Sequence, residues 1–386
     1  MKSLSGLLMN ISPSATLAVN DKAKALKASG RDIISLAGGD PDFATPEHIV
    51  QAAMDALRAG DTHYPPSRGT LSMRQAVADK LAREYGLEVN PATQVLVSPG
   101  AKFLIYAALV SLVNPGDEVL VLEPYWVSYV PMVLMAGATP VTVPLSSRNQ
   151  FRITEAVAEA ITPRTKVLMV NSPNNPTGHV ISASEAELVR KIAIEHDLFV
   201  ISDEIYEKLI FEGTHINLAS LPGMADRTIT INGHSKAYAM TGWRLGWAAG
   251  PESVIGLMAK LQSQTVTSAA SFTMAAGAAA LNGSQEPVEV MRLAYKDRRD
   301  FMVDALNAIP GVLCDKPAGA FYLFVRFPGL GADSMTIADT LLEKADIAAT
   351  PGIAFGQAGE GHVRFSIATA MSELERAVVR IENLMK

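Results

Sequence analysis

Cysteine is nearly absent from this chain, because Cys314 is the only one among 386 residues. A single cysteine excludes an internal disulfide framework and any metal site built from a cluster of cysteines. The seven histidines show no spacing typical of metal ligands, so we predict no metal site. No apolar run reaches the roughly 20 residues that a membrane-spanning helix needs.

A large excess of charge of either sign is also missing. The 33 basic and 39 acidic residues give a formal net charge of −6, which argues against nucleic acid as a partner. The N-terminal stretch Leu4–Met9 is too short and too weakly flanked for a secretion signal. An apolar content of 48% and a length sufficient for two domains predict a globular, cytoplasmic protein.

Short apolar runs alternate with amphipathic stretches through the middle of the chain. Val119–Leu122, Val167–Val170 and Phe199–Ser202 have the composition of buried strands, and Ala183–His196 has the periodicity of a helix. This alternation predicts an α/β fold with a mostly parallel central sheet between helices. Near Val288–Leu306 the pattern becomes a long charged amphipathic helix, followed by the hairpin-like run Ala320–Val325 and a terminal helix.

The stretch 233–246 places Lys236 eight residues before Arg244, just after an apolar strand at 228–231. A pyridoxal-phosphate enzyme needs such a pair, because a lysine amine must reach the cofactor's aldehyde carbon while a guanidinium holds its phosphate. By itself this spacing occurs by chance on exposed helices. Its value comes from three segments that precede it.

Each upstream segment places a polar or flexible group where an apolar strand ends. Asn175 lies in the Pro- and Gly-rich run 171–178, and Asp203 closes a buried-strand pattern at the edge where open α/β sheets bind ligands. The strand 95–98 turns through Gly100 into an apolar helix, whose free backbone amides can hold a phosphate. Taken singly, each has an ordinary alternative as a turn, cap or core residue.

Together these motifs resemble the pyridoxal-phosphate aminotransferases of fold type I, and more closely their prokaryotic-type aspartate aminotransferase branch. The resemblance runs from Pro13–Thr16 and Gly38–Phe43 to Arg364, nearly end to end. It implies a large cofactor-binding domain at 41–295 and a smaller α+β domain at 296–386, which the N-terminal segment 1–40 joins. It is far more specific for the cofactor and the fold than for the amino acid used.

The resemblance implies a role for each residue of the cofactor site. Lys236 is expected to form the Schiff base with pyridoxal 5'-phosphate and then to move the substrate's proton. Asp203 is expected to pair with the ring nitrogen, Tyr206 and Asn175 to bond the ring hydroxyl oxygen, and Trp126 to stack on the ring. Lys236, Asp203 and Tyr206 make up the expected catalytic set.

The phosphate and the substrate have their own expected contacts. Arg244 and the turn formed by Gly100, Ala101 and Lys102 are predicted to bind the phosphate. Arg364 is predicted to hold the substrate's α-carboxylate through a bidentate fork, with Gly39 contributing backbone nearby. Trp126 and Asn175 complete the expected substrate-binding set.

Two positions depart from the family's lysine motif. Gly233 stands where many members carry a hydroxyl for the phosphate, so the hydroxyl of Ser235 is an alternative donor. His234 stands where a small or apolar residue is usual. Because it has no paired acid or metal-ligand partner in the sequence, we favour a neutral, packed histidine over a modifier of lysine basicity.

The resemblance also implies a homodimer with the active site at the subunit boundary. Tyr64 matches the tyrosine that reaches the phosphate of the neighbouring subunit, so a monomer would be an incomplete catalyst. A loop tyrosine packed within its own chain is the alternative.

We therefore predict ping-pong transfer of an amino group from an L-amino acid to a 2-oxo acid. Aspartate with 2-oxoglutarate is the favoured pair, and Ser14 and Thr16 are candidates for the substrate's distal group. Aminotransferases with aromatic, arginine or methionine donors stay open, as does a β-lyase or decarboxylase on the same fold. A regulatory module that senses pyridoxal phosphate is disfavoured, because such relatives usually carry an added DNA-binding domain and no segment here accommodates one.

Overall fold

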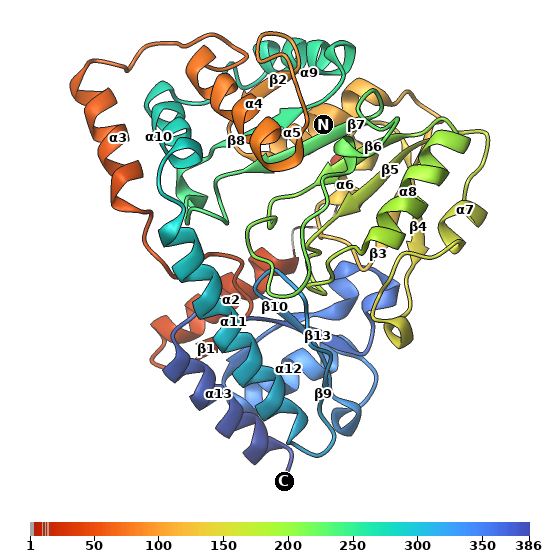
Figure 1. The fold of residues 1–386 in the computed structure, drawn as a ribbon. Helices are drawn as coiled ribbons and strands as arrows, with labels where there is room; N and C mark the ends of the chain where they lie inside the picture. The colour runs from red at the N-terminus through yellow and green to blue at the C-terminus, as the bar shows by residue number, and fades with distance from the viewer. Residues whose placement is uncertain (1–3, 10, 12, 14) are drawn as a thin grey trace.

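The computed structural model describes residues 4–9, 11, 13 and 15–386, and these form an upper and a lower lobe (Figure 1). The upper lobe contains a seven-stranded sheet in the order β2-β8-β7-β6-β5-β3-β4. Strand β8 runs antiparallel to both of its neighbours, and the other pairs are parallel. The strands are β2 (Val95–Ser98), β3 (Glu118–Glu123), β4 (Thr139–Pro144), β5 (Thr165–Asn171), β6 (Phe199–Asp203), β7 (Thr228–Gly233) and β8 (Gly246–Ala249).

Helices cover both faces of this sheet because its strands are apolar on both sides. In β3, Val119 and Val121 pack into a core with helices α5 and α9, whereas Leu120 packs into a second core with α8. Side chains of a strand alternate between faces, so a continuous apolar run requires a layer of helices on each side. This arrangement confirms the predicted α/β fold.

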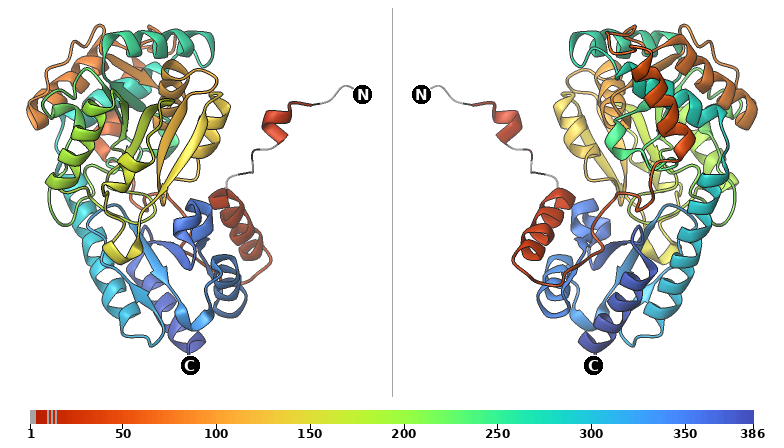
Figure 2. Two further views of the ribbon diagram at one scale, coloured as in Figure 1. Left: turned by 90° about the vertical axis from the view of Figure 1, so that its right-hand side faces the viewer. Right: turned by 90° about the vertical axis from the view of Figure 1, so that its left-hand side faces the viewer.

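The lower lobe is built from both ends of the described chain. Its antiparallel sheet has the order β12-β13-β10-β9, and a separate parallel pair joins β1 to β11 by placing Ile34 beside Ile347. Figure 2 shows the N-terminal helix α2 lying against the C-terminal segments. The strands are β1 (Ile34–Ser35), β9 (Leu313–Cys314), β10 (Tyr322–Arg326), β11 (Ile347–Ala348), β12 (Thr350–Pro351) and β13 (His362–Ser366).

The long helix α11 runs from the upper lobe into the lower one (Figure 1). It covers the predicted amphipathic stretch, and a boundary between residues 295 and 296 within it stays a prediction. The helices are α1 (Gly6–Met9), α2 (Ala15–Ala28), α3 (Glu47–Arg58), α4 (Leu71–Tyr85), α5 (Ala101–Leu112), α6 (Tyr129–Met135), α7 (Ala156–Glu159), α8 (Ala183–Glu195), α9 (Glu252–Gln264), α10 (Ser271–Asn282), α11 (Glu286–Asn307), α12 (Ser334–Ala345) and α13 (Met371–Leu384).

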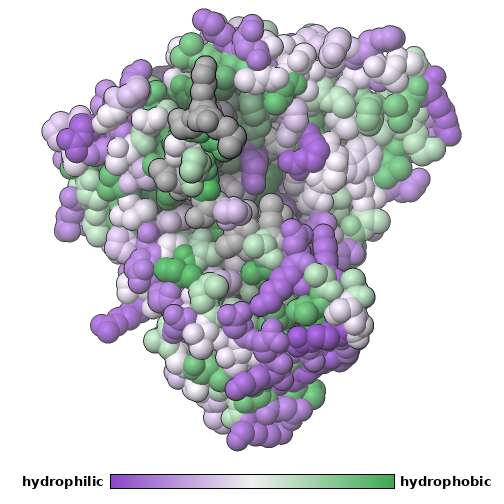
Figure 3. All heavy atoms as spheres, turned by 180° about the vertical axis from the view of Figure 1, so that it is seen from behind, coloured by the Kyte–Doolittle hydropathy of each residue, from purple (hydrophilic) through white to green (hydrophobic). Residues whose placement is uncertain are grey.

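Surface polarity differs between the lobes. On the face seen from behind, hydrophilic side chains crowd the lower lobe, and hydrophobic ones are more frequent on the upper lobe (Figure 3). Among the described residues, none of the helices combines the length and the apolar character needed to cross a membrane.

Candidate active site

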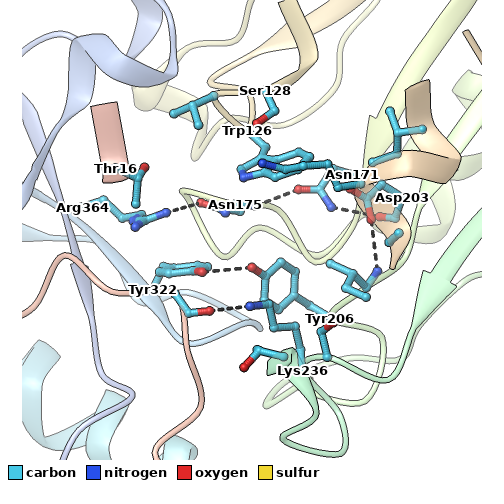
Figure 4. A pocket seen from close by; sticks show the side chains of 18 of the residues that line it. Thr16, Trp126, Ser128, Asn171, Asn175, Asp203, Tyr206, Lys236, Tyr322 and Arg364 are labelled. Atoms are coloured by element: carbon cyan, nitrogen blue, oxygen red, sulfur yellow. Dashed lines mark hydrogen bonds between the residues drawn. The ribbon is translucent and has the colours of Figure 1, made fainter. Parts of the chain in front are cut away.

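The carboxyl ends of β2, β3, β5, β6 and β7 meet at one edge of the large sheet, since these strands are mutually parallel. The loops that follow them surround a cavity of about 300 Å³, which segments of the lower lobe close from the other side (Figure 4). Ten residues predicted for the site line this cavity: Gly39, Ala101, Lys102, Trp126, Asn175, Asp203, Tyr206, Lys236, Arg244 and Arg364.

One end of the cavity is suited to an anion. Helix α5 begins at Ala101, so its first backbone N–H groups have no partner within the helix. Gly100 precedes it with φ of +95°, and a Cβ at that position would lie 2.7 Å from Arg244 Nη2. Only glycine therefore lets the guanidinium of Arg244 approach the turn this closely. Two sources of positive charge converge there, a helix N-terminus and an arginine.

Asp203 provides a buried negative charge on another wall of the cavity. Its side chain accepts a 2.6 Å hydrogen bond from the Tyr129 hydroxyl and a longer one from the Ile205 amide. Burial raises the pKa of Asp203 to about 6, although the hydrogen bond from Tyr129 works against this shift. A carboxylate that is costly to keep ionised here would be stabilised by a bound cation.

Lys236 follows β7 and donates a hydrogen bond to the Gly39 carbonyl across the cavity. Burial lowers the pKa of Lys236 to about 8, Asp40 raises it, and the guanidinium groups of Arg364 and Arg244 lower it. A substantial fraction of the amine is therefore neutral near physiological pH. Neutral amine is the form that acts as nucleophile and base.

Arg364 lies on β13 and is only 1% exposed. Its Nη1 donates to Asn175 Oδ1 at 2.9 Å and its Nη2 to the Ala37 carbonyl at 2.7 Å, while its buried Nε has no partner within the described part of the chain. The rings of Tyr322 and Phe355 lie 4.3 and 5.1 Å from the guanidinium carbon. Because none of the described acidic residues pairs with it, this buried guanidinium is prepared to receive a carboxylate.

Comparison with known proteins identifies this arrangement. Residues 31–381 match the model of the family described as aminotransferase class I and II. The chain belongs to this family. It is 43% identical to an aspartate aminotransferase of Musicola paradisiaca, in a match that covers 98% of this chain and 95% of the relative. It is 42% identical to aromatic-amino-acid aminotransferase 2 of Thermococcus litoralis, in a match that covers 99% of this chain and 98% of the relative.

The fold agrees with this assignment. The structure of aspartate aminotransferase from Thermus thermophilus with maleate superposes with a TM-score of 0.96, covers 100% of both chains and is 43% identical. These findings confirm the family resemblance and the fold type inferred from the sequence. The protein is an aminotransferase.

Several residues of the aminotransferase site were not predicted from the sequence. Asn171 donates to the Asp203 carbonyl and accepts from the Asn175 amide, so a row of hydrogen bonds connects Arg364 to Asp203 (Figure 4). Tyr129 and Tyr322 were also missed. The Tyr322 hydroxyl shares a 2.9 Å hydrogen bond with the Tyr206 hydroxyl.

Two predicted residues do not line the cavity. Gly100 precedes the lining residue Ala101, and its missing Cβ leaves room for Arg244. The Tyr64 side chain is 90% exposed, which disagrees with packing inside its own chain, and its service to a neighbouring copy stays a prediction. Of the two candidates for the distal group, Thr16 lines the cavity and Ser14 lies outside the described residues.

The departures from the family's lysine motif have local explanations. Gly233 faces Gly246 across β7 and β8, where an added Cβ would lie 3.0 Å from the Leu245 carbonyl oxygen. His234 is fully buried, its Nε2 lies 3.2 Å from the Gly277 carbonyl, and burial lowers its pKa to about 4. It is a neutral, packed histidine, as favoured from the sequence. Ser235 lines the cavity.

Proposed function

We propose that this aminotransferase binds pyridoxal 5'-phosphate in the cavity and transfers an amino group from an L-amino acid, with aspartate favoured, to a 2-oxo acid, with 2-oxoglutarate favoured. The observation that carries the proposal is the set of complementary charges around one cavity. Lys236 supplies a partly neutral amine, Asp203 a buried carboxylate, and Arg244 and Arg364 two separate anion sites.

The residues present fit the cofactor group by group. The α5 turn, Arg244 and Ser235 suit its phosphate, and Asp203 suits a protonated ring nitrogen. Because Asn175 Oδ1 already accepts from Arg364, its amide nitrogen is the group left to donate to a ring oxygen, together with the Tyr206 hydroxyl. When bound, the cofactor carries the amino group and withdraws electrons from the substrate's α-carbon.

The chain's own groups would then position the substrate and move one proton. Arg364 holds the α-carboxylate through two parallel hydrogen bonds, which fixes the α-carbon relative to the upper lobe. Neutral Lys236 Nζ would accept the proton from that carbon and then give it up on the cofactor side of the site instead of returning it to the same carbon, since its lowered pKa suits both steps. Tyr129 holds Asp203 in place during the reaction.

Lys102 is the group that favours a dicarboxylic substrate. It lines the cavity with its Nζ 4.9 Å from the Trp126 ring centroid, and no described acidic residue pairs with it. Burial and then Arg244 lower its pKa, which a second substrate carboxylate would reverse. Thr16 and Ser128 add hydroxyl groups to the same lining. Lys102 would therefore supply the positive charge for the distal carboxylate, which hydroxyl groups alone cannot supply.

Aromatic donors are the second candidate. The Thermococcus relative, named for aromatic amino acids, is almost as similar as the Musicola aspartate enzyme. Ile105, Trp126 and Val127 also give the cavity apolar lining.

Half-reaction rates across a panel of amino donors, followed by the cofactor's absorbance, test the proposal. We expect aspartate and glutamate to rank first, and Lys102→Met to lower kcat/KM for them roughly 10- to 100-fold, the value of one charge-assisted hydrogen bond. Neutral and aromatic donors should change by less than about threefold, because they lack the second carboxylate.

Two controls accompany this panel. Lys191→Met removes an exposed lysine on α8 and should leave every rate unchanged. Lys236→Ala should lose both the borohydride-reducible link to pyridoxal phosphate and turnover. Aromatic donors ranking above aspartate in the unmodified enzyme would refute the aspartate preference, and a reducible link surviving in Lys236→Ala would refute the role of Lys236.

The assembly proposed with this function is a homodimer in the cytoplasm, in which Tyr64 of one copy serves the phosphate of the other. Support comes from the exposure of Tyr64 and of apolar side chains on the same lobe, including Leu57, Leu71 and Leu257. Such exposed apolar surface is typical of an interface.

A further inference from the structure

The turn after β6 directs neighbouring side chains in opposite directions. Asp203 and Tyr206 line the cavity, whereas the carboxylates of Glu204 and Glu207 are buried away from it. Two buried carboxylates on one short turn are costly unless each has partners. The groups that provide these partners come from helix α4 and from residues 202–217.

Glu207 is held by α4. Lys80, which is only 2% exposed, places its Nζ 2.8 Å from Glu207 Oε1 and 2.5 Å from Glu84 Oε2, and Tyr85 donates its hydroxyl proton to Glu207. Lys208 Nζ approaches Glu84 from the more exposed side at 2.7 Å. Arg83 Nη2 lies 3.4 Å from Glu84 Oε1, so Glu84 has three cations near it. Among the described residues, Glu207 has Lys80 as its only lysine or arginine within 4.0 Å.

Glu204 is held by a second group of donors. Its oxygens accept from Ser202 Oγ at 2.8 Å and Asn217 Nδ2 at 2.9 Å, and His215 Nε2 lies 2.8 Å from Oε2. The rings of Tyr85 and His215 pack edge to face, with their centroids 5.7 Å apart. This contact connects the partners of Glu204 to the partners of Glu207. Both carboxylates of the turn are thus fixed from behind.

Two other uses of this cluster fit less well. Glu204, Glu207 and His215 could offer ligand atoms to a metal, but Lys80 Nζ already neutralises Glu207 and His215 Nε2 already contacts Glu204. A role in stability alone is also weak, because buried ion pairs often contribute no more than apolar residues of the same volume. What such a pair does enforce is one geometry of the segments that carry it.

We propose that Lys80 is a positioning residue, which through Glu207 fixes the 203–207 turn so that Asp203 and Tyr206 face the cavity. The proposal rests on the proposed function of those two residues. Without Lys80, the carboxylate of Glu207 would be buried and uncompensated, and the turn would rotate to bring it toward water. Tyr206 is its immediate neighbour in the chain and would move with it.

Kinetics of three variants with cofactor bound test this proposal. Lys80→Met should lower kcat on the order of 10²-fold, the effect of misplacing catalytic groups by about 1 Å, with KM for aspartate changed by less than about threefold. KM is spared because Arg364 lies on β13 in the other lobe. Lys80→Met combined with Glu207→Met removes both charges and should recover most of the loss. Lys208→Met, at the exposed side of the cluster, should behave like the unmodified enzyme.

A second readout needs neither activity nor cofactor. In the cofactor-free protein, hydrogen exchange of the peptide covering residues 199–210 should accelerate at least tenfold in Lys80→Met and return toward normal in the double variant. A peptide from α8, at 183–195, serves as the internal reference. If Lys80→Met does not fold, Glu207→Gln takes its place, because Lys80 then still has Glu84.

The outcomes separate this proposal from the proposed function. A folded Lys80→Met with normal kcat and normal exchange at 199–210, but a lower melting temperature, would overturn the positioning role. A kcat for the double variant that is lower than the kcat of Lys80→Met would also overturn it. If Asp203→Asn keeps full kcat, the proposed function of Asp203 fails, and the exchange measurement still decides whether Lys80 holds the turn.

Discussion

At the scale of single residues, the site brings together groups whose charges are unfavourable before any ligand binds. Arg364 and Arg244 both act on Lys236 and lower its pKa, and Asp40 is the carboxylate that opposes them. Asp40 is itself held by the Thr241 hydroxyl at 2.5 Å. Burial, and then the balance between these charges, sets the pH at which Lys236 becomes a nucleophile.

Removing Asp40 should make Lys236 reactive at lower pH. In the cofactor-free protein, the rate of borohydride-trapped attachment of pyridoxal phosphate should rise with pH through about 8, because neutral amine is the attacking form. Asp40→Asn keeps an acceptor for Thr241 but no longer stabilises the ammonium, so the midpoint should fall. Asp42→Asn, whose carboxylate pairs with Arg298, is the matched control and should leave the midpoint unchanged. A midpoint that rises in Asp40→Asn would contradict this account.

Residues at strand ends could be predicted from the sequence because their chemistry and their local pattern agree. Asp203 is the last residue of the apolar strand β6 and Lys236 follows the apolar strand β7, and parallel strands end at one edge of the sheet. Tyr129 and Tyr322 could not be predicted this way. Their partners Asp203 and Tyr206 are 74 and 116 residues away, and nothing in a local pattern specifies such a distant hydrogen bond.

At the scale of elements, the turn between β2 and α5 combines backbone geometry with charge. Gly100 has ψ of 157° at its positive φ, a region that is open almost only to glycine. Gly86 ends α4 in the left-handed region, but a Cβ there would meet nothing within 4 Å. Comparing a substitution at Gly100 with one at Gly86 therefore distinguishes the effect of backbone strain, which both share, from the effect of displacing Arg244, which only Gly100 has.

Gly100→Ala should weaken cofactor binding, whereas Gly86→Ala should not. Each change should cost at least about 1 kcal/mol in the free energy of unfolding, because a non-glycine residue is strained at positive φ. Only the methyl group at position 100 pushes Arg244 Nη2 away, which should raise Kd for pyridoxal phosphate about tenfold or more through one lost charge-assisted contact. Urea unfolding and a fluorescence titration measure the two effects. Equal affinities in both variants would exclude this role for the turn.

At the scale of the whole molecule, the two ends of the chain meet in the lower lobe. The parallel pairing of β1 with β11 joins Ile34 to Ile347, and Arg31 adds an ion pair to Asp346. Such two-residue strands carry no periodicity that a sequence can reveal. The alternating strands and helices predicted the class of the upper lobe, but the joining of the ends was expected only from the family resemblance.

The proposed dimer can be tested by mixing two defective variants, because a complete site would then need residues from both chains. If Tyr64 of one copy completes the site of the other, Tyr64→Ala should bind pyridoxal phosphate weakly, and Lys236→Ala should be inactive. A mixed dimer of these two variants has one site with both changes and one site with neither. After unfolding and refolding together in equal amounts, about a quarter of all sites should regain wild-type affinity and turnover, as random pairing of a symmetric dimer requires. Mixing without refolding is the control. A mixture that never exceeds the sum of the separate variants would show that each chain completes its own site.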